Sequence, residues 1–199
     1  MRLNRRRGER GQSLVEFTMI IPIVLTMALS IAEFGVAFGT NMTMIEATRE
    51  GARVGAILVN GAGSFGCPGY TGSTNVDPQI VAAVQRAIES PGSGIKLSNV
   101  DWIKIWQSDA DGNPVPTTVN KWTPTTPSGG PLVCGVHLDF LQGPVNWDAS
   151  LRANVLPVQA IGVSIQYRYQ MFTPLAALTG LLGLNTITMV DSTVMDFEP

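Results

Sequence analysis

The chain has 199 residues, and its 13 basic and 15 acidic side chains give a formal net charge of only −2. Five of the basic residues lie among the first ten positions, so the remainder is acidic, which argues against a nucleic-acid-binding surface. Two cysteines and a single histidine, His137, exclude a Cys/His zinc site and argue against a His-based catalytic triad. No phosphate-binding glycine loop, nucleophile elbow or paired carboxylates occur either, so we expect no enzyme activity, metal, cofactor or small-molecule substrate.

The N-terminal residues combine a basic cluster with a long apolar run. Residues 1–11 form a basic leader, and residues 14–39 contain only Glu16 and Glu33 as charged side chains. This run exceeds the roughly 20 residues that span a bilayer. Because the arginines precede it, we expect a single-pass protein of the bacterial inner membrane, with a cytoplasmic N-terminus and an extracytoplasmic C-terminal domain.

A cleaved secretory signal is the competing interpretation. Ser30, Ile31 and Ala32 form a small-x-small cleavage site before Glu33. It leaves Glu16 unexplained, because an ionisable side chain within a membrane segment costs a few kcal/mol or more. For a retained anchor, Glu33 has three interpretations: protonation, a position near the outer headgroups, or pairing with a neighbouring subunit.

The helix is expected to continue beyond the membrane, over residues 12–59. Residues 40–59 lack proline and sort into a charged face and a face of small residues. Glycines recur at four-residue spacing in both parts of the helix: Gly35, Gly39, Gly51 and Gly55. Such spacing allows close approach of helices in a membrane, and it equally suits packing of the helix on its own domain.

Four segments together resemble the TadE family, the pilin-like proteins of tight-adherence (Flp-type) pilus systems. They are residues 10–17 (Arg-Gly-Gln-Ser-Leu-Val-Glu-Phe), Pro22, residues 33–35 (Glu-Phe-Gly) and residues 46–53 (Glu-Ala-Thr-Arg-Glu-Gly-Ala-Arg). The resemblance covers about a quarter of the chain, in family order and at family-like spacing.

The resemblance implies cleavage by a prepilin peptidase after Gly11 and a mature N-terminus at Gln12. It also implies that Glu16 offsets the α-amino group of a neighbouring subunit, because a buried charge needs a partner. Glu33 is a second candidate assembly residue, and the implied partners are other pilin-like subunits and the pilus assembly platform. Gln12 departs from the phenylalanine or methionine common in type IV pilins, and the chain is longer than the major Flp pilin. The expected function is therefore that of a minor pilin-like subunit; the alternative is an envelope protein with a TadE-like anchor that acts outside pilus assembly.

The rest of the chain predicts an α+β outer domain. Residues 60–76 read as a glycine-rich linker, and residues 77–199 as a helix on an antiparallel sheet, together a pilin-like arrangement. Asp77 and Pro78 are expected to cap and begin the helix, which ends at residues 90–92.

Alternation and turn residues then mark the expected strands and loops. Strands are predicted at residues 100–107, 133–140, 161–169 and 186–197, a turn at 108–113 and a loop at 122–131. In residues 161–169 the odd-numbered side chains are expected to face inward and the even-numbered ones outward. Residues 174–184 suit core filler, a short helix or a subunit-docking surface.

Three smaller features each have more than one interpretation. Cys67 and Cys134 would form a disulfide in an oxidising compartment, or remain two buried thiols. Residues 109–113 suit a hairpin turn better than a calcium loop, since the bidentate acid of an EF-hand is missing at residue 120. His137 is expected to be a packed or surface side chain.

Overall fold

The computed structural model describes residues 6–61, 67–153, 159–174, 176, 180 and 186–197, with side chains from residue 11 onward. The chain divides into two compact units. One comprises Met1–Ala37 and Gln170–Thr186 and is called the N-terminal unit below. The other comprises Phe38–Tyr169 and Ile187–Pro199 and is called the sheet unit.

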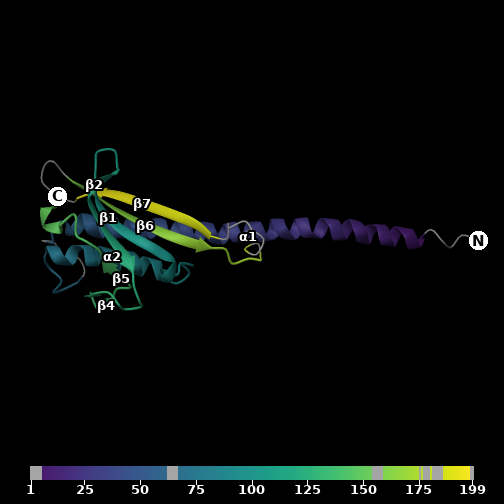
Figure 1. The fold of residues 1–199 in the computed structure, drawn as a ribbon, viewed down its shortest axis with the longest axis horizontal. Coiled ribbons are helices and arrows are strands. Elements are labelled where there is room, and N and C mark those ends of the chain that lie inside the picture. Colours follow the sequence, from purple (N-terminus) through teal and green to yellow (C-terminus); the bar gives the residue numbers. More distant parts are fainter. Residues whose placement is uncertain are drawn as a thin grey trace, which may run out of the picture. The chain divides into compact units, whose positions relative to one another are not determined.

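Helix α1 (Arg6–Leu58) is continuous for 53 residues, as the sequence predicts (Figure 1). It passes through Pro22 without ending, although proline removes one backbone hydrogen bond. After Leu58 the backbone turns left-handed at Val59 (φ 46°) and Gly61 (φ 87°). At Gly61 a Cβ atom would collide with the backbone of Gly72, so only glycine suits this exit from the helix.

The sheet unit contains a five-stranded sheet, which confirms the predicted α+β class. The strand order is β5-β2-β1-β6-β7, and the β1–β2, β1–β6 and β2–β5 pairs are antiparallel. The strands are β1 (Val100–Ser108), β2 (Pro114–Pro124), β5 (Phe140–Gln142), β6 (Ala160–Gln170) and β7 (Thr186–Asp196). A separate hairpin pairs β3 (Leu132–Val133) with β4 (Val136–His137), and His137 on it is exposed.

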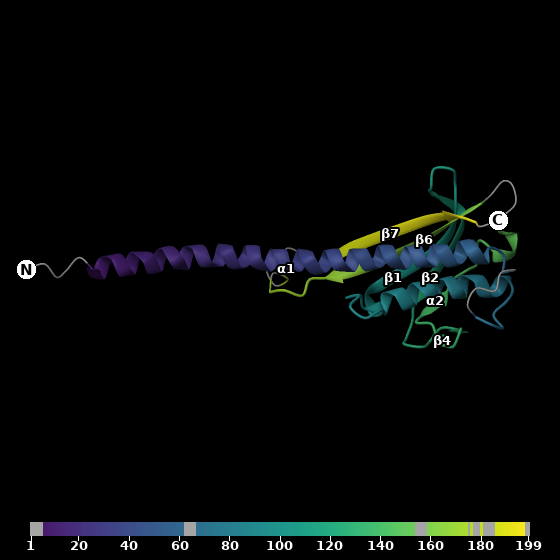
Figure 2. The same ribbon diagram turned by 180° about the vertical axis from the view of Figure 1, so that it is seen from behind.

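Helix α2 (Val76–Ile88) and the sheet-unit part of α1 cover one face of this sheet (Figure 2). Apolar side chains of α1, α2 and the sheet are fully buried between the helices and the sheet: Met44, Ala47, Ile80, Val84, Ile103, Ile105, Trp122, Val163 and Ile165. The opposite side of α1 carries Glu46, Arg49 and Arg53 in exposed positions, so the predicted division of this helix into two faces is confirmed.

The other sheet face departs from the predicted alternation in β6. The odd-numbered residues from Ile161 to Tyr169 are buried as expected, but Gly162 and Ser164 are buried too. The indole of Trp106, on the adjacent strand, lies where a Gly162 side chain would stand, and its Nε1 donates to the Ser164 hydroxyl at 3.2 Å. Because glycine has no side chain, the Trp106 indole can pack directly against the backbone at Gly162.

Three other predictions are wrong in detail. The N-cap of α2 is Asn75, so Asp77 lies inside the helix, where its carboxylate binds another partner described below. The expected strand at residues 133–140 is interrupted, because Cys134 (φ 54°) and Gly135 (φ 78°) form a tight turn between β3 and β4. The expected loop at residues 122–131 begins only after Pro124, since β2 extends to that residue.

Two further predictions have different outcomes. The turn at residues 108–113 is a hairpin turn in which the Asp109 carboxylate accepts the backbone N–H groups of Asp111 (3.0 Å) and Asn113 (2.7 Å). The expectation for residues 174–184 lies largely outside the described residues, of which this stretch contains only 174, 176 and 180.

Candidate membrane and assembly interface

The N-terminal unit presents an apolar helical surface. Of the described residues, one helix is long and apolar enough to cross a membrane, and it lies near the N-terminus. Its large apolar side chains are mostly exposed: Leu14, Val15, Phe17, Met19, Ile20, Ile23, Val24, Leu25, Met27, Ile31 and Phe34. A contiguous exposed apolar surface of this kind marks a contact with lipid or with another protein.

Polar side chains in this stretch are satisfied locally. The hydroxyls of Thr18, Thr26 and Ser30 each donate to the carbonyl four residues earlier, at 2.7–2.8 Å. Back-bonding of this type satisfies a hydroxyl within its own helix and makes it compatible with an apolar environment.

Glu16 lies in this surface with its side chain exposed. The Gln12 amide Nε2 donates to Glu16 Oε1 at 3.0 Å, one helical turn away. Gly11, Gln12 and Glu16 therefore all lie on one exposed stretch of helix α1. The carboxylate stays on the surface, where another molecule can reach it.

Glu33 has a different environment, because it is 93% buried, with 7% of its surface exposed. Its Oε1 accepts the backbone N–H of Phe172 at 3.2 Å, and its Oε2 accepts that of Thr173 at 3.0 Å. The structure thus places Glu33 against the residues that follow β6, an intramolecular contact that the sequence does not predict and that is compatible with a position near the outer headgroups.

The four regularly spaced glycines fall into two groups. A Cβ atom added at Gly35 or Gly39 would meet nothing within 4 Å. At Gly51 it would approach a methyl of Val84 on α2 to 2.6 Å, and at Gly55 one of Ile161 on β6 to 2.7 Å. Gly51 and Gly55 therefore pack within the sheet unit, whereas the surface at Gly35 and Gly39 is open to another molecule.

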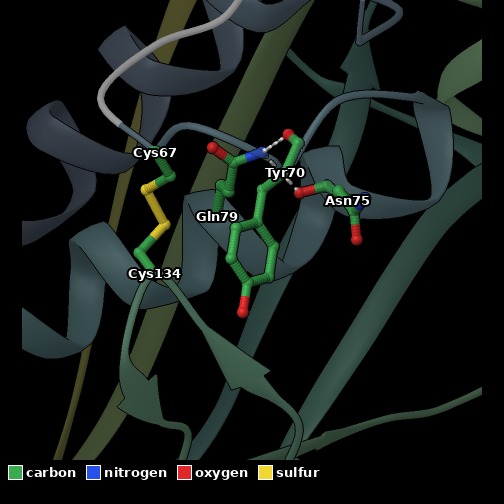
Figure 3. The surroundings of a disulfide bond; sticks show 5 residues. All are labelled: Cys67, Tyr70, Asn75, Gln79 and Cys134. Carbon is green, nitrogen blue, oxygen red and sulfur yellow. Dashed lines mark hydrogen bonds between the residues drawn. A yellow bond between two sulfur atoms is a disulfide. The ribbon is translucent and has the colours of Figure 1, made fainter.

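Cys67 and Cys134 are joined by a disulfide with a Cα–Cα distance of 5.4 Å (Figure 3). It ties the segment after α1 to the β3–β4 turn. Nearby, the Gln79 side chain donates to the carbonyls of Tyr70 and Asn75, both at 3.0 Å. These two bonds attach residues 70–75, which follow Cys67 in the same segment, to α2.

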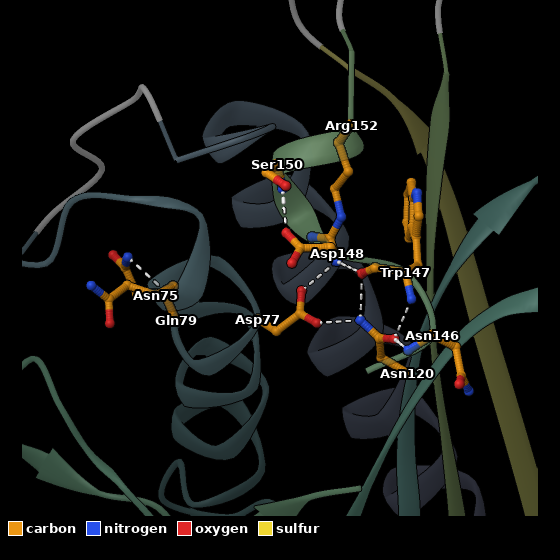
Figure 4. A network of polar contacts seen from close by, with 9 residues as sticks. All are labelled: Asn75, Asp77, Gln79, Asn120, Asn146, Trp147, Asp148, Ser150 and Arg152. Atoms are coloured by element: carbon orange, nitrogen blue, oxygen red, sulfur yellow. Dashed lines mark hydrogen bonds and ion pairs between the residues drawn. The ribbon is translucent and has the colours of Figure 1, made fainter. Parts of the chain in front are cut away.

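A buried polar network joins α2, β2 and residues 146–152 (Figure 4). Asp77 accepts from the Arg152 guanidinium and from the Asn120 amide, both at 2.6 Å. Asn120 also donates to the Trp147 carbonyl and accepts the backbone N–H groups of Asn146 and Trp147, each at 2.8 Å. The Arg152 guanidinium stacks over the Trp147 ring at 4.3 Å. The network is enclosed, so its chemistry is that of a structural crosslink.

Nothing in the sequence predicts this network. The sequence pattern places Asp77 at a helix cap, and Arg152 and Asn120 belong to no motif. Only their position in the fold brings them together. Beside them, the backbone N–H of Ser150 donates to Asp148 at 2.8 Å and holds the pKa of that exposed carboxyl below its ordinary value of 3.8.

The described part of the chain contains no cluster of three or more His, Cys, Asp or Glu side chains that could hold a metal ion. One hollow of about 310 Å³ lies on the sheet face that carries Trp106, lined also by Trp102, Lys104 and Val190. The Lys104 ammonium lies 4.1 Å from the centre of the Trp102 ring. No carboxylate, histidine or cysteine lines this hollow, so it offers no acid–base pair.

The fold and the exposed helix define a class of protein: an α+β domain that follows an N-terminal helix capable of crossing a membrane. Residues 11–53 match the model of a family described as TadE-like protein, which confirms the resemblance drawn from the sequence. The match ends within α1, so α2 and the sheet lie outside it. The comparisons with curated proteins and with solved structures gave no match.

Proposed function

We propose that this chain is a non-catalytic, minor pilin-like subunit that helps assemble a tight-adherence (Flp-type) pilus or a related secretion filament. The observation that carries the proposal is the TadE-like match over residues 11–53, which begins at the glycine of the proposed processing site. The proposed location is the bacterial inner membrane, with the arginine cluster in the cytoplasm, because basic residues are retained on that side.

The proposed mechanism begins with cleavage by a prepilin peptidase after Gly11. Cleavage creates an α-amino group at Gln12, one helical turn from Glu16. Because Glu16 is exposed on the helix, it can reach the α-amino group of an adjacent subunit. In a low-dielectric surrounding two such charges attract strongly, and either one alone is costly. The pair would fix the axial register between neighbouring N-terminal helices.

The exposed surface at Gly35 and Gly39 supports lateral association of these helices. Small residues at four-residue spacing allow two helix backbones to approach closely, here at the outer boundary of the bilayer. Gly51 and Gly55, which face α2 and β6, are left out of this proposed intermolecular contact.

The experiment is to determine the mature N-terminus by mass spectrometry in the native host, with and without its prepilin peptidase. A peptidase-dependent start at Gln12 supports the proposal. Gly11→Val should abolish this cleavage, and the matched variant Gly8→Val should not. A start at Glu33 would mean a secretory signal, and an intact Met1 would leave a plain membrane-anchored protein that acts outside pilus assembly; either contradicts the proposal.

A second measurement tests assembly itself. Glu16→Gln should abolish co-purification with other pilin-like subunits, because it leaves the partner's α-amino group uncompensated. Glu46→Gln removes a carboxylate from an exposed position farther along the same helix and should leave co-purification unchanged. Equal effects of the two substitutions would contradict a specific role of Glu16.

A further inference from the structure

Glu33 fastens a second segment to the membrane-capable helix. Each oxygen of its carboxylate accepts one backbone N–H, from Phe172 and from Thr173, and the side chain is 93% buried, with 7% of its surface exposed. All three residues belong to the N-terminal unit. Charge-assisted hydrogen bonds to two successive peptide groups fix the height of residues 172–173 along the helix.

The helical rise gives that height relative to a bilayer. Residues 14–32 form 19 residues of α1 between the basic leader and Glu33. At 1.5 Å per residue they extend about 28 Å, close to the ~30 Å thickness of the hydrocarbon core. If this stretch spans the core, Glu33 lies at the boundary farther from the N-terminus, and residues 172–173 lie there with it.

The side chains at this height are apolar and exposed. Ile31 is 73% exposed, Phe34 72% and Phe172 60%. Exposed apolar side chains at a membrane boundary are typical of elements that lie in the interface.

We propose that Phe172, just after β6, forms a second membrane contact, which lies in the headgroup region of the outer leaflet. Its partner is the lipid bilayer, because the exposed Phe172 side chain continues the apolar surface that α1 presents to lipid. Glu33 is the anchor that holds the two membrane elements at one depth. The inference rests on the membrane placement within the proposed function and is independent of pilin-type processing.

The test measures the depth of position 172 in a membrane. Phe172→Cys carries a nitroxide label in the full-length protein, and the two native cysteines are already joined. The protein is placed in liposomes of phosphatidylcholine and phosphatidylglycerol, and collisions of the label with oxygen and with a water-soluble nickel complex are compared. Ile23→Cys serves as the deep reference, and Leu132→Cys, half-exposed on the sheet unit, as the aqueous reference.

The ratio of oxygen to nickel collisions at position 172 should exceed that at 132 several-fold and remain below that at 23. A ratio equal to that at 132 would overturn the inference. So would spin–spin broadening at 172 that grows with the protein-to-lipid ratio, because a second copy of the chain would then cover this site.

Glu33→Gln tests the anchor. The glutamine side chain has only one acceptor oxygen, so one of the two backbone N–H groups loses its partner. The label at 172 should then become several-fold more accessible to nickel, whereas Glu46→Gln, at an exposed position of the sheet unit, should leave it unchanged. An unaltered label in Glu33→Gln, with the Cys67–Cys134 disulfide intact by mass, would overturn the anchoring role.

The two proposals fail in different ways. Interfacial depth at 172 in a protein whose N-terminus is never cut after Gly11 would contradict pilin-type processing and retain the membrane contact. A start at Gln12, together with a label at 172 that remains in water, would support pilin-type processing and overturn the membrane contact.

Discussion

The two parts of α1 use the same small-residue spacing for different contacts. In the N-terminal unit, Gly35 is surrounded by exposed apolar side chains, and its own surface is open. In the sheet unit, Gly51 is buried against Val84 and Val163, and charged residues occupy the opposite side of the helix. The comparison teaches that glycine spacing indicates close approach, and that the chemistry of the remaining helix surface indicates what approaches.

This difference predicts separable effects of substitution. Changes in the sheet unit should lower its free energy of unfolding and leave membrane insertion intact, because its core is internal. Changes on the surface of residues 11–37 should alter membrane contact or assembly and leave that free energy unchanged.

The largest effect is expected at the buried ion pair. Asp77→Ala leaves the Arg152 guanidinium buried without its partner and should lower the free energy of unfolding by about 3–5 kcal/mol. The measurement is urea unfolding in detergent, followed by tryptophan fluorescence. Asp101→Ala, which breaks the more exposed pair with Arg168, should cost less than ~1 kcal/mol. Equal losses would show that the enclosed network contributes no more than a surface pair.

The second-largest loss of stability is expected when the disulfide is removed. Replacing Cys67 and Cys134 together by serine should lower the free energy of unfolding of the sheet unit by about 2–4 kcal/mol, because the crosslink restricts the unfolded chain. The same urea titration measures it. Wild-type protein under reducing conditions provides the control and should match the double variant; a reduced protein as stable as the oxidised one would contradict the prediction.

Substitutions at Gly51 and Gly35 test the difference between the two parts of α1 directly. Gly51→Leu forces a side chain into the space held by Val84 and Val163, and overpacking of this kind costs about 1–3 kcal/mol. Gly35→Leu should leave the free energy of unfolding unchanged, since nothing lies within 4 Å of that position. Should both variants unfold at the same urea concentration, the distinction between the two parts of the helix would be lost.

The smallest effect concerns acid. The Ser150 N–H lowers the pKa of Asp148 in the folded state, so the ionised carboxyl adds stability above its ordinary pKa of 3.8. That contribution should disappear as the pH falls from this value through the lower, folded pKa. Asp148→Ala should therefore unfold at nearly the same urea concentration as wild type at low pH and at a slightly lower one at neutral pH. A difference between the two proteins that grows as the pH falls would contradict this assignment.

The sequence was sufficient where a pattern repeats along a single element. The continuous α1, its charged and small-residue faces, and strand β6 follow from periodicity, and strands β1 and β7 from the residues of each single segment. Strand β2 is not predicted at all, because Pro114 and Pro116 disfavour a strand and residues 122–124 are expected to be loop. The two prolines lie toward one end of the strand, and its centre carries the buried Asn120 and Trp122.

Contacts between distant residues could not be predicted. The partner of Asp77 is Arg152 and that of Glu33 is the backbone at residues 172–173. Every residue except proline has a backbone N–H, so the sequence does not indicate which N–H groups will bind a buried carboxylate. The burial of Gly162 likewise depends on a tryptophan from another strand. Only the strand register, which sets Trp106 opposite Gly162, places them together.

The packing of Gly51 against Val163 has a consequence for the order in which the domain can form during export. In the proposed topology the sheet-unit part of α1 is exported first, whereas β6, one of its two packing partners at Gly51, lies much later in the sequence. Contacts between such distant residues close late and slow the folding of a domain. Until β6 has emerged, the small-residue face of α1 lacks part of its covering, and during that interval a chaperone or a neighbouring subunit could bind it.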